Sequence, residues 1–221
     1  PLIIYVNDNA AGNNNGSSWT NAYHYLQDAF TAATAGDQIW VAAGSYRPDQ
    51  GAGYTSANRA YTFLLKNNVS VYGGFVGTES NLSQRTLMSN PSILTGDLAG
   101  NDGANFTNYS DNSYNVVSSI NVSSSTVFDG FTLTAGNAEG PYPSSRGGGI
   151  LNNGLTYPAI RNCIFKLNRA QHSGGGMYNM GGAIPVISNC VFSRNRAEDV
   201  GGAFQNASSG ATVINCTFIN N

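Results

Sequence analysis

The last third of the chain contains one unit written three times, and this repeat restricts the fold more than any other feature. Each copy opens with a glycine block, GGGILNN, GGGMYNM or GGAFQNA, whose first residues are Gly147, Gly174 and Gly201. These glycines are 27 residues apart in both intervals. A fixed period of this length is typical of a solenoid, in which each repeat forms one coil and neighbouring coils stack.

Each copy continues with a second block in which Cys, Phe and Asn return at fixed positions: AIRNCIFKLNRA, VISNCVFSRNRA and VINCTFINN. The third block arrives one residue early, which indicates a shortened loop. Stacked parallel strands lie about 4.8 Å apart, so equivalent residues should form ladders along the stack. The predicted ladders are Cys163, Cys190 and Cys216; Phe165, Phe192 and Phe218; Asn168, Asn195 and Asn221; and Asn152, Asn179 and Asn206.

The runs between the glycines favour strands over helices. Helical repeats need amphipathic stretches of about 10 residues or more, and these units lack them. Their short runs are rich in β-branched and aromatic residues and are separated by Gly, Asn and Ser, which is typical of short strands joined by tight turns. The Cys and Phe positions share one face of a strand, so both ladders should point inward. The first explanation for an Asn ladder at a coil corner is structural, because Asn tolerates left-handed backbone and can form a hydrogen bond with its equivalent in the next coil.

The pairing of GGG[IM] or GGAF with FxxN (FKLN, FSRN, FINN) resembles the repeats of the polymorphic outer-membrane protein family. More widely, it resembles the right-handed parallel β-helix repeats of secreted bacterial proteins. The resemblance covers roughly residues 126–221. It implies an all-β fold, a right-handed parallel β-helix with about 27 residues per regular coil, and an extracellular or cell-surface location. It implies less about function, because this fold carries adhesins, fibre shafts, lyases and hydrolases.

The N-terminal part predicts a short helix between strands. Ala22, Leu26, Ala29, Phe30 and Ala33 follow a helical spacing. The preceding Thr20 or Asn21 is the expected cap, and Gly36 the expected end. One helix flanked by strands fits an N-terminal cap over the first coil, where unpaired strand edges need cover. The segment SWTNAYHYLQDAFTAATAGDQIWVAAGSYRP is also similar to N-terminal segments of secreted bacterial β-helix proteins.

We predict a single β-helix domain over residues 1–221, in three parts. Residues 1–46 form the cap and the first strands, 47–125 form irregular coils with long loops, and 126–221 form the regular coils. The chain ends within the last FxxN turn, without a further capping element. We expect either a longer β-helix, a following domain, or self-association through the last coil. The irregular loops are the expected place for a functional surface.

The amino-acid composition limits the kinds of partner that we expect. Charged residues make up 10% of the chain and the net charge is −2, so we expect no nucleic-acid partner. No apolar run is long enough to predict a membrane span. The three cysteines follow the repeat and not a metal-binding spacing, so we interpret them as buried apolar residues. Neighbouring coils also lie within disulfide reach, which leaves a bond between two of them open.

Few residues are candidates for metal binding or catalysis. The segment GDLAGNDG offers Asp97, Asn101 and Asp102 as candidate oxygen ligands for calcium, the one cofactor considered, although a turn-forming loop explains them as well. Asp111 and Asp129 lie further along the chain. His24 and His172 are far apart in the sequence, and no catalytic residue is assigned.

Two functions remain open. The first is a non-enzymatic extracellular module, such as a surface adhesin, a passenger domain or a fibre subunit, with self-association or a glycan or cell-surface ligand as its partner. The second is a polysaccharide-active lyase or hydrolase, or a glycan-binding module. Loop tyrosines, which can stack on sugar rings, add to the glycan hypothesis.

Overall fold

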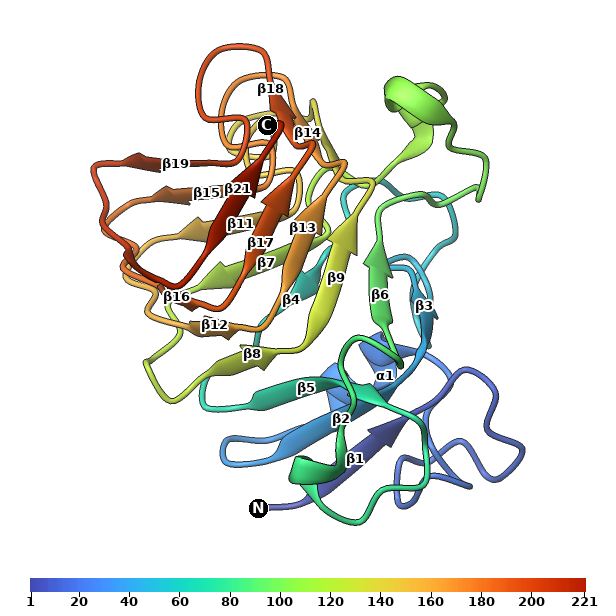
Figure 1. The fold of residues 1–221 in the computed structure, drawn as a ribbon. Helices are drawn as coiled ribbons and strands as arrows, with labels where there is room; N and C mark the ends of the chain where they lie inside the picture. The colour runs from blue at the N-terminus through green and yellow to red at the C-terminus, as the bar shows by residue number, and fades with distance from the viewer.

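The computed structural model describes residues 1–221, and its strands form four sheets in which every pairing is parallel (Figure 1). The largest sheet contains β1 (Ile3–Val6), β2 (Gln38–Ala42), β5 (Ser70–Phe75), β8 (Val127–Asp129), β12 (Ala159–Arg161), β16 (Val186–Ser188) and β20 (Thr212–Ile214). The second contains β3 (Gly44–Tyr46), β6 (Ser92–Thr95), β9 (Phe131–Thr134), β13 (Ile164–Lys166), β17 (Val191–Ser193) and β21 (Thr217–Ile219).

Two smaller sheets complete the strand framework, and no sheet closes on itself. The third contains β4 (Phe63–Leu64), β7 (Val117–Ile120), β11 (Ile150–Asn153), β15 (Met177–Met180) and β19 (Phe204–Ala207). The fourth contains β10 (Asn137–Ala138), β14 (Arg169–Ala170) and β18 (Arg196–Ala197). The short helices are α1 (Leu26–Ala32), η1 (Leu82–Gln84), η2 (Ala104–Phe106) and η3 (Tyr109–Asp111). No helix has the length and apolarity to cross a membrane.

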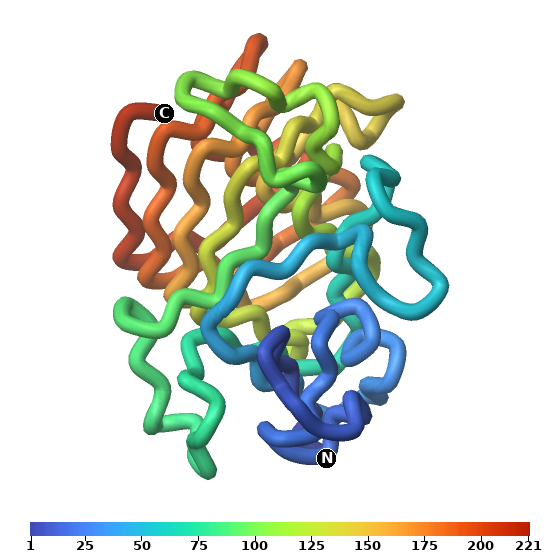
Figure 2. Tube along the Cα trace, turned by 90° about the vertical axis from the view of Figure 1, so that its right-hand side faces the viewer, coloured from blue at the N-terminus to red at the C-terminus, as the bar shows by residue number.

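Each copy of the sequence repeat forms one structural repeat. From β11 to β14 the chain contributes one strand to each sheet in turn, and β15 then returns to pair with β11. Phe165 pairs in register with Phe192, and Phe192 with Phe218. Figure 2 shows successive segments side by side in chain order, from blue to red. This arrangement of stacked parallel strands is compatible with a parallel β-helix.

The core runs through the whole stack as one continuous cluster of 27 buried residues. Alternation along short strands explains its composition, because every second side chain of a strand points to the same face. Ile160, Cys163 and Phe165 are fully buried in one coil, while Arg161 between them is exposed. The first clear copy of the pattern, at residues 126–138, fills the same positions with Phe128, Phe131 and Leu133.

The N-terminal helix is shorter than the sequence pattern predicts. It begins after Tyr25, not at Thr20 or Asn21, and it ends before Gly36. The Asn21 side chain is used elsewhere: its Oδ1 accepts from the Asn13 amide at 3.0 Å, and its backbone carbonyl accepts from Asn15 and Gly16. Asn21 therefore bonds within the preceding loop, and no side chain caps the start of the helix.

The apolar stripe that predicted the helix is buried all the same. Leu26, Ala29, Phe30 and Ala33 join the common core, and Ala22 is fully buried in the segment before the helix. The helix lies against β1, β2 and β4, and Phe30 packs near Phe63 with ring centroids 6.4 Å apart.

Candidate functional site

The first Asn ladder lies inside the third sheet and carries a chain of side-chain hydrogen bonds. Asn152 Nδ2 donates to Asn179 Oδ1 at 2.7 Å, and Asn179 Nδ2 donates to Asn206 Oδ1 at 2.8 Å. Ser119 starts the chain by donating to Asn152 Oδ1 at 2.6 Å. Asn152 and Asn179 are fully buried, whereas Asn206 is exposed. Buried amides need such partners, so these bonds tie each coil to the next.

The second Asn ladder lies at the corner after the Phe strand. Asn168 Nδ2 donates to Asn195 Oδ1 at 3.1 Å, and Asn195 Nδ2 donates to Asn221 Oδ1 at 2.8 Å. Each amide also donates to the backbone of the preceding coil; Asn195 Nδ2 reaches the Phe165 carbonyl at 2.9 Å. The left-handed residues here are the ones just before the ladder, such as Leu167 and Arg194. The Asn side chains therefore stabilise a turn in which the residue before each Asn, and not the Asn itself, has left-handed backbone.

Sequence reasoning missed a third Asn ladder, which precedes the Cys positions. Asn162, Asn189 and Asn215 all have left-handed backbone, with φ of 52°, 54° and 49°. Asn215 Nδ2 donates to Asn189 Oδ1 at 2.8 Å, so its donors point toward the N-terminus, opposite to the other two ladders. The signal was present as the recurring Asn-Cys pair in RNC, SNC and INC.

The leading glycines of the repeat occupy left-handed turns. Gly147, Gly174 and Gly201 have φ of 69°, 67° and 69°. A Cβ at Gly174 would clash with the Met177 carbonyl oxygen. Glycine is therefore required by both the backbone conformation and the space.

The Cys and Phe ladders form the centre of the regular coils. Phe165 and Phe192 stack at 4.5 Å with ring planes 3° apart, and Phe192 and Phe218 stack at 5.1 Å. Cys163 and Cys190 are buried, and Cys216 is partly exposed. All three cysteines are free thiols in this structure. Burial raises the pKa of the Cys163 thiol, which suits a packing residue and not a nucleophile.

The candidate calcium residues lie in the loop that follows β6, where Asp97 organises the backbone. Asp97 Oδ1 accepts from the Gly100 and Asn101 amides at 2.7 and 3.1 Å, and its Oδ2 accepts from the Asp102 amide at 3.2 Å. Asn101 contributes its backbone to this turn and its side chain is exposed. No group of three or more His, Cys, Asp or Glu side chains is arranged to hold a metal ion. Calcium binding at this loop stays a prediction.

A cluster of oxygen atoms without partners lies just behind that turn. Asp102 Oδ1, Asp111 Oδ2, Asn112 Oδ1 and Ser113 Oγ are buried and have no hydrogen-bond partner. Asp102 keeps one contact, a 2.7 Å hydrogen bond from Asn112 Nδ2 to its Oδ2. Burial, with the charges of Asp97 and Asp111 added, raises the pKa of Asp102 to about 6. The folded protein therefore favours the protonated form of this carboxyl group.

We predict that Asp102 lowers the free energy of unfolding as the pH rises. Its folded pKa lies above the value in the unfolded chain, so its contribution is greatest below about pH 4 and is lost as pH rises through about 6. Asp102→Asn keeps an acceptor for Asn112 and should flatten this slope. At pH 7 the variant should gain about 1 kcal/mol, a figure reduced for solvent screening. Urea unfolding measured between pH 4 and 8 tests it. The control is Asp28→Asn, which forms no ion pair and keeps an acceptor for the Ala52 amide. An unchanged slope in Asp102→Asn would contradict the prediction.

The other polar residues singled out in the sequence are held in separate contacts. Asp129 is buried and accepts from Arg85 Nη1 at 3.3 Å and from Asn162 Nδ2 at 3.0 Å. His24 bonds the Ala10 carbonyl through Nε2 at 2.8 Å, and His172 Nδ1 lies 2.8 Å from Asp199 Oδ2. The structure does not bring the two histidines together.

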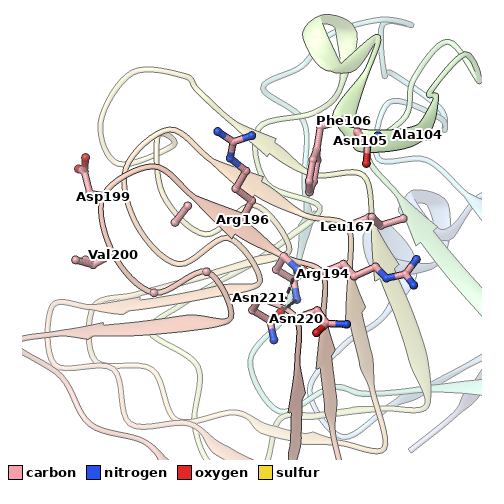
Figure 3. Close-up of a pocket in the computed structure, with 14 residues that line it drawn as sticks. Ala104, Asn105, Phe106, Leu167, Arg194, Arg196, Asp199, Val200, Asn220 and Asn221 are labelled. Carbon is pink, nitrogen blue, oxygen red and sulfur yellow. Dashed lines mark hydrogen bonds between the residues drawn. The ribbon is translucent and has the colours of Figure 1, made fainter.

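A cleft beside the last coils was not predicted from the sequence. It is a cleft of about 750 Å³ between the η2 loop and the turns around β18 (Figure 3). Phe106 and Asn105 line one side, and Leu167, Arg194 and Arg196 line the other. Both arginines are exposed, and neither forms an ion pair or a side-chain hydrogen bond within the protein. We call this site the η2 cleft.

Comparison with protein-family models, with curated proteins and with solved structures gives no match to this chain. The fold and the ladders define a repeat protein built of stacked parallel strands. The finer resemblance to polymorphic outer-membrane protein repeats rests on the GGG and FxxN motifs alone.

Proposed function

We propose that this protein is a right-handed parallel β-helix with an N-terminal helical cap, and that it serves as an extracellular structural or adhesive module. Surface adhesins, passenger domains and fibre subunits are the kinds of protein that we include. The stacked, all-parallel sheets support the coiled arrangement. The repeat motifs support the handedness and the location, through their resemblance to secreted bacterial repeats.

The observation that carries the proposal is that stacked phenylalanines and asparagine hydrogen bonds join each coil to the next. Phe192 is fully buried, but Phe218, its equivalent in the last coil, is 46% exposed. Val213, which is in register with the fully buried Ile187, is likewise 40% exposed. Edge strands with apolar side chains are templates for further strands. A further coil of the same repeat type, joined to this face, would cover these side chains.

The unpaired donors and acceptors of the Asn ladders indicate which hydrogen-bonding groups such a coil must present. Asn206 Nδ2 has no partner in the protein, so a matching coil should place an amide oxygen against it. Asn215 requires a donor instead, because its Nδ2 donates to Asn189 Oδ1 and its own Oδ1 is free to accept a hydrogen bond. The occupant therefore presents acceptors at the GG[AG]xxN position and a donor at the Asn-Cys position. Another copy of the repeat meets both requirements.

We expect that a second copy of residues 196–221, attached after Asn221, raises the unfolding temperature. The added coil would cover Phe218 and extend the ladders, and each added interface stabilises a repeat protein. A gain of about 2 kcal/mol corresponds to roughly 4–8 °C for a chain of this size. Circular dichroism measures the shift, and the same residues attached in shuffled order are the control. Equal unfolding temperatures for the two extended chains would refute the stacking proposal.

The polysaccharide-active alternative remains a prediction of the sequence. New reducing ends or unsaturated products from a polysaccharide incubated with the protein would establish it in place of the structural proposal. The best candidate carboxylates, Asp97 and Asp129, already accept two or more hydrogen bonds each from the protein.

A further inference from the structure

The loop before the first glycine block is longer than its equivalent in the next coil. Gly136 and Gly147 are 11 residues apart (147 − 136), whereas the equivalent Asn168 and Gly174 are 6 apart (174 − 168). The additional residues lie in the segment 139–146, which follows β10. This segment reaches the outer face of the third sheet, where it forms part of a pocket.

The pocket has a volume of about 190 Å³, and we call it the 139–146 pocket. Ser118 of β7 and Leu151 of β11, which pair in register, form its floor. Pro143 and Ser144 form one wall, and Thr62 before β4 belongs to the other. Both floor strands are paired on each side, in the order β4-β7-β11-β15, so the pocket is independent of the last coil.

Two polar side chains that line the pocket are buried but have atoms without partners. Asn115 and Ser118 are each 6% exposed. Asn115 Nδ2 donates to the Arg146 and Gly147 carbonyls at 2.7 and 2.8 Å, which leaves Asn115 Oδ1 as a free acceptor. Ser118 Oγ forms no hydrogen bond, and neither oxygen is sealed from solvent. Buried polar atoms are normally paired, so these two are available to a ligand.

The lining indicates an uncharged ligand. No charged side chain lines the pocket, and Ala60, Pro143 and Leu151 give it apolar surface. Arg59, next to Ala60 in the chain, is paired with Glu139 at 2.9 Å. An acetamido group has one N–H donor, one carbonyl acceptor and one methyl group. It therefore matches a free amide oxygen, a free hydroxyl group and an apolar wall.

An exposed aromatic ring lies next to the pocket. Tyr142 precedes Pro143 in the wall and is 67% exposed. Arg146 Cζ lies 5.0 Å from the centre of the Tyr142 ring and 5.7 Å from that of Tyr178 on β15. These contacts connect the loop to the sheet, so the position of the ring is set before a ligand binds. A tyrosine ring presents an apolar face that can pack against a sugar ring.

We propose that the 139–146 pocket binds the acetamido group of an N-acetylated amino sugar. Asn115 Oδ1 accepts from the amide N–H, Ser118 Oγ donates to the carbonyl, and the methyl group packs against Leu151. The sugar ring packs against Tyr142. This inference rests on the adhesive role proposed above and names the class of ligand. Its test measures ligand binding, whereas the stacking test measures the stability of an added coil, so one can fail without the other.

Isothermal titration with triacetylchitotriose tests the proposal. Cellotriose has the same linked rings with a hydroxyl group in place of each acetamido group, and it should bind at least about tenfold more weakly. Ser118→Ala should lower the affinity for triacetylchitotriose by about threefold to tenfold, because it removes one hydrogen bond. The matched control is Ser193→Ala, which changes a half-buried serine of β17 in another sheet.

Tyr142→Ala should also lower the affinity by about threefold to tenfold, because it removes the face against which the sugar packs. Its matched control is Tyr25→Ala, which removes an exposed tyrosine next to the N-terminal helix. Affinities that the two pocket variants lower and the two control variants leave within about twofold would support the site.

Three results would overturn the proposal. Equal affinities for triacetylchitotriose and cellotriose would show that the acetamido group is not recognised. Equal losses in Ser118→Ala and Ser193→Ala would place the binding elsewhere. The absence of binding to both triacetylchitotriose and N-acetylgalactosamine at millimolar concentration would show that the pocket does not take this class of sugar. Unchanged unfolding temperatures verify that each variant is folded.

Discussion

Replacing Phe192 with alanine is expected to lower the free energy of unfolding by about 3–5 kcal/mol. The ring is fully buried and stacks on Phe165 at 4.5 Å and on Phe218 at 5.1 Å. Its removal leaves a cavity in the middle of the ladder, where rigid neighbouring coils cannot close around it. Urea unfolding monitored by circular dichroism gives the value.

Phe218→Ala is the matched control for this substitution. The residue type, strand position and register are the same, but Phe218 is 46% exposed. We expect a loss of about 1–2 kcal/mol, in proportion to the smaller area removed from contact. Equal losses at the two positions would show that the Phe ladder does not stabilise the coils through burial.

Asn179→Ala is expected to lower the free energy of unfolding by about 2–4 kcal/mol, although it removes few atoms. The substitution leaves the fully buried Asn152 Nδ2 without its acceptor at 2.7 Å and removes the donor to Asn206. A buried polar group that loses its partner costs about 1–3 kcal/mol. Thermal and urea unfolding both measure the effect.

The same ladder supplies the control for Asn179. Asn206→Ala should cost less than about 1 kcal/mol, because Asn206 is exposed and water can replace its amide as a partner of Asn179. If both substitutions cost under 1 kcal/mol, the ladder would contribute little and the stack would depend on apolar packing alone.

Much of the regular region could be predicted because its period is directly visible. Equivalent residues recur at a spacing of 26 or 27 residues, and one parallel strand pairing then determines the position of all the ladder residues. The Cys and Phe positions alternate with polar ones, so their inward direction follows from strand geometry. The third Asn ladder was open to the same argument, since Asn precedes every Cys.

The irregular region could not be predicted in this way. The helical stripe from Ala22 to Ala33 indicated an α-helix, yet the helix covers only Leu26–Ala32, and Asn21 bonds within the preceding loop. The acidic turn at Asp97 suggests ligands for calcium, which stays a prediction; the hydrogen bonds from the Gly100 and Asn101 amides to its carboxylate could not be read from the sequence. Competition between a side chain's local and distant partners is not visible in a sequence pattern.

The sequence by itself determined the repeat, its strands and the residues that stack, because periodicity needs only local information. Only the tertiary structure decided where the η2 loop lies. Phe106 and Arg196 are far apart in the chain, and no periodic signal connects them. The hydrogen bond from Tyr109 to the Leu167 carbonyl holds the η2 loop against the repeats. Contacts of this kind depend on which surface a long loop packs against, and that choice is made by the folded stack.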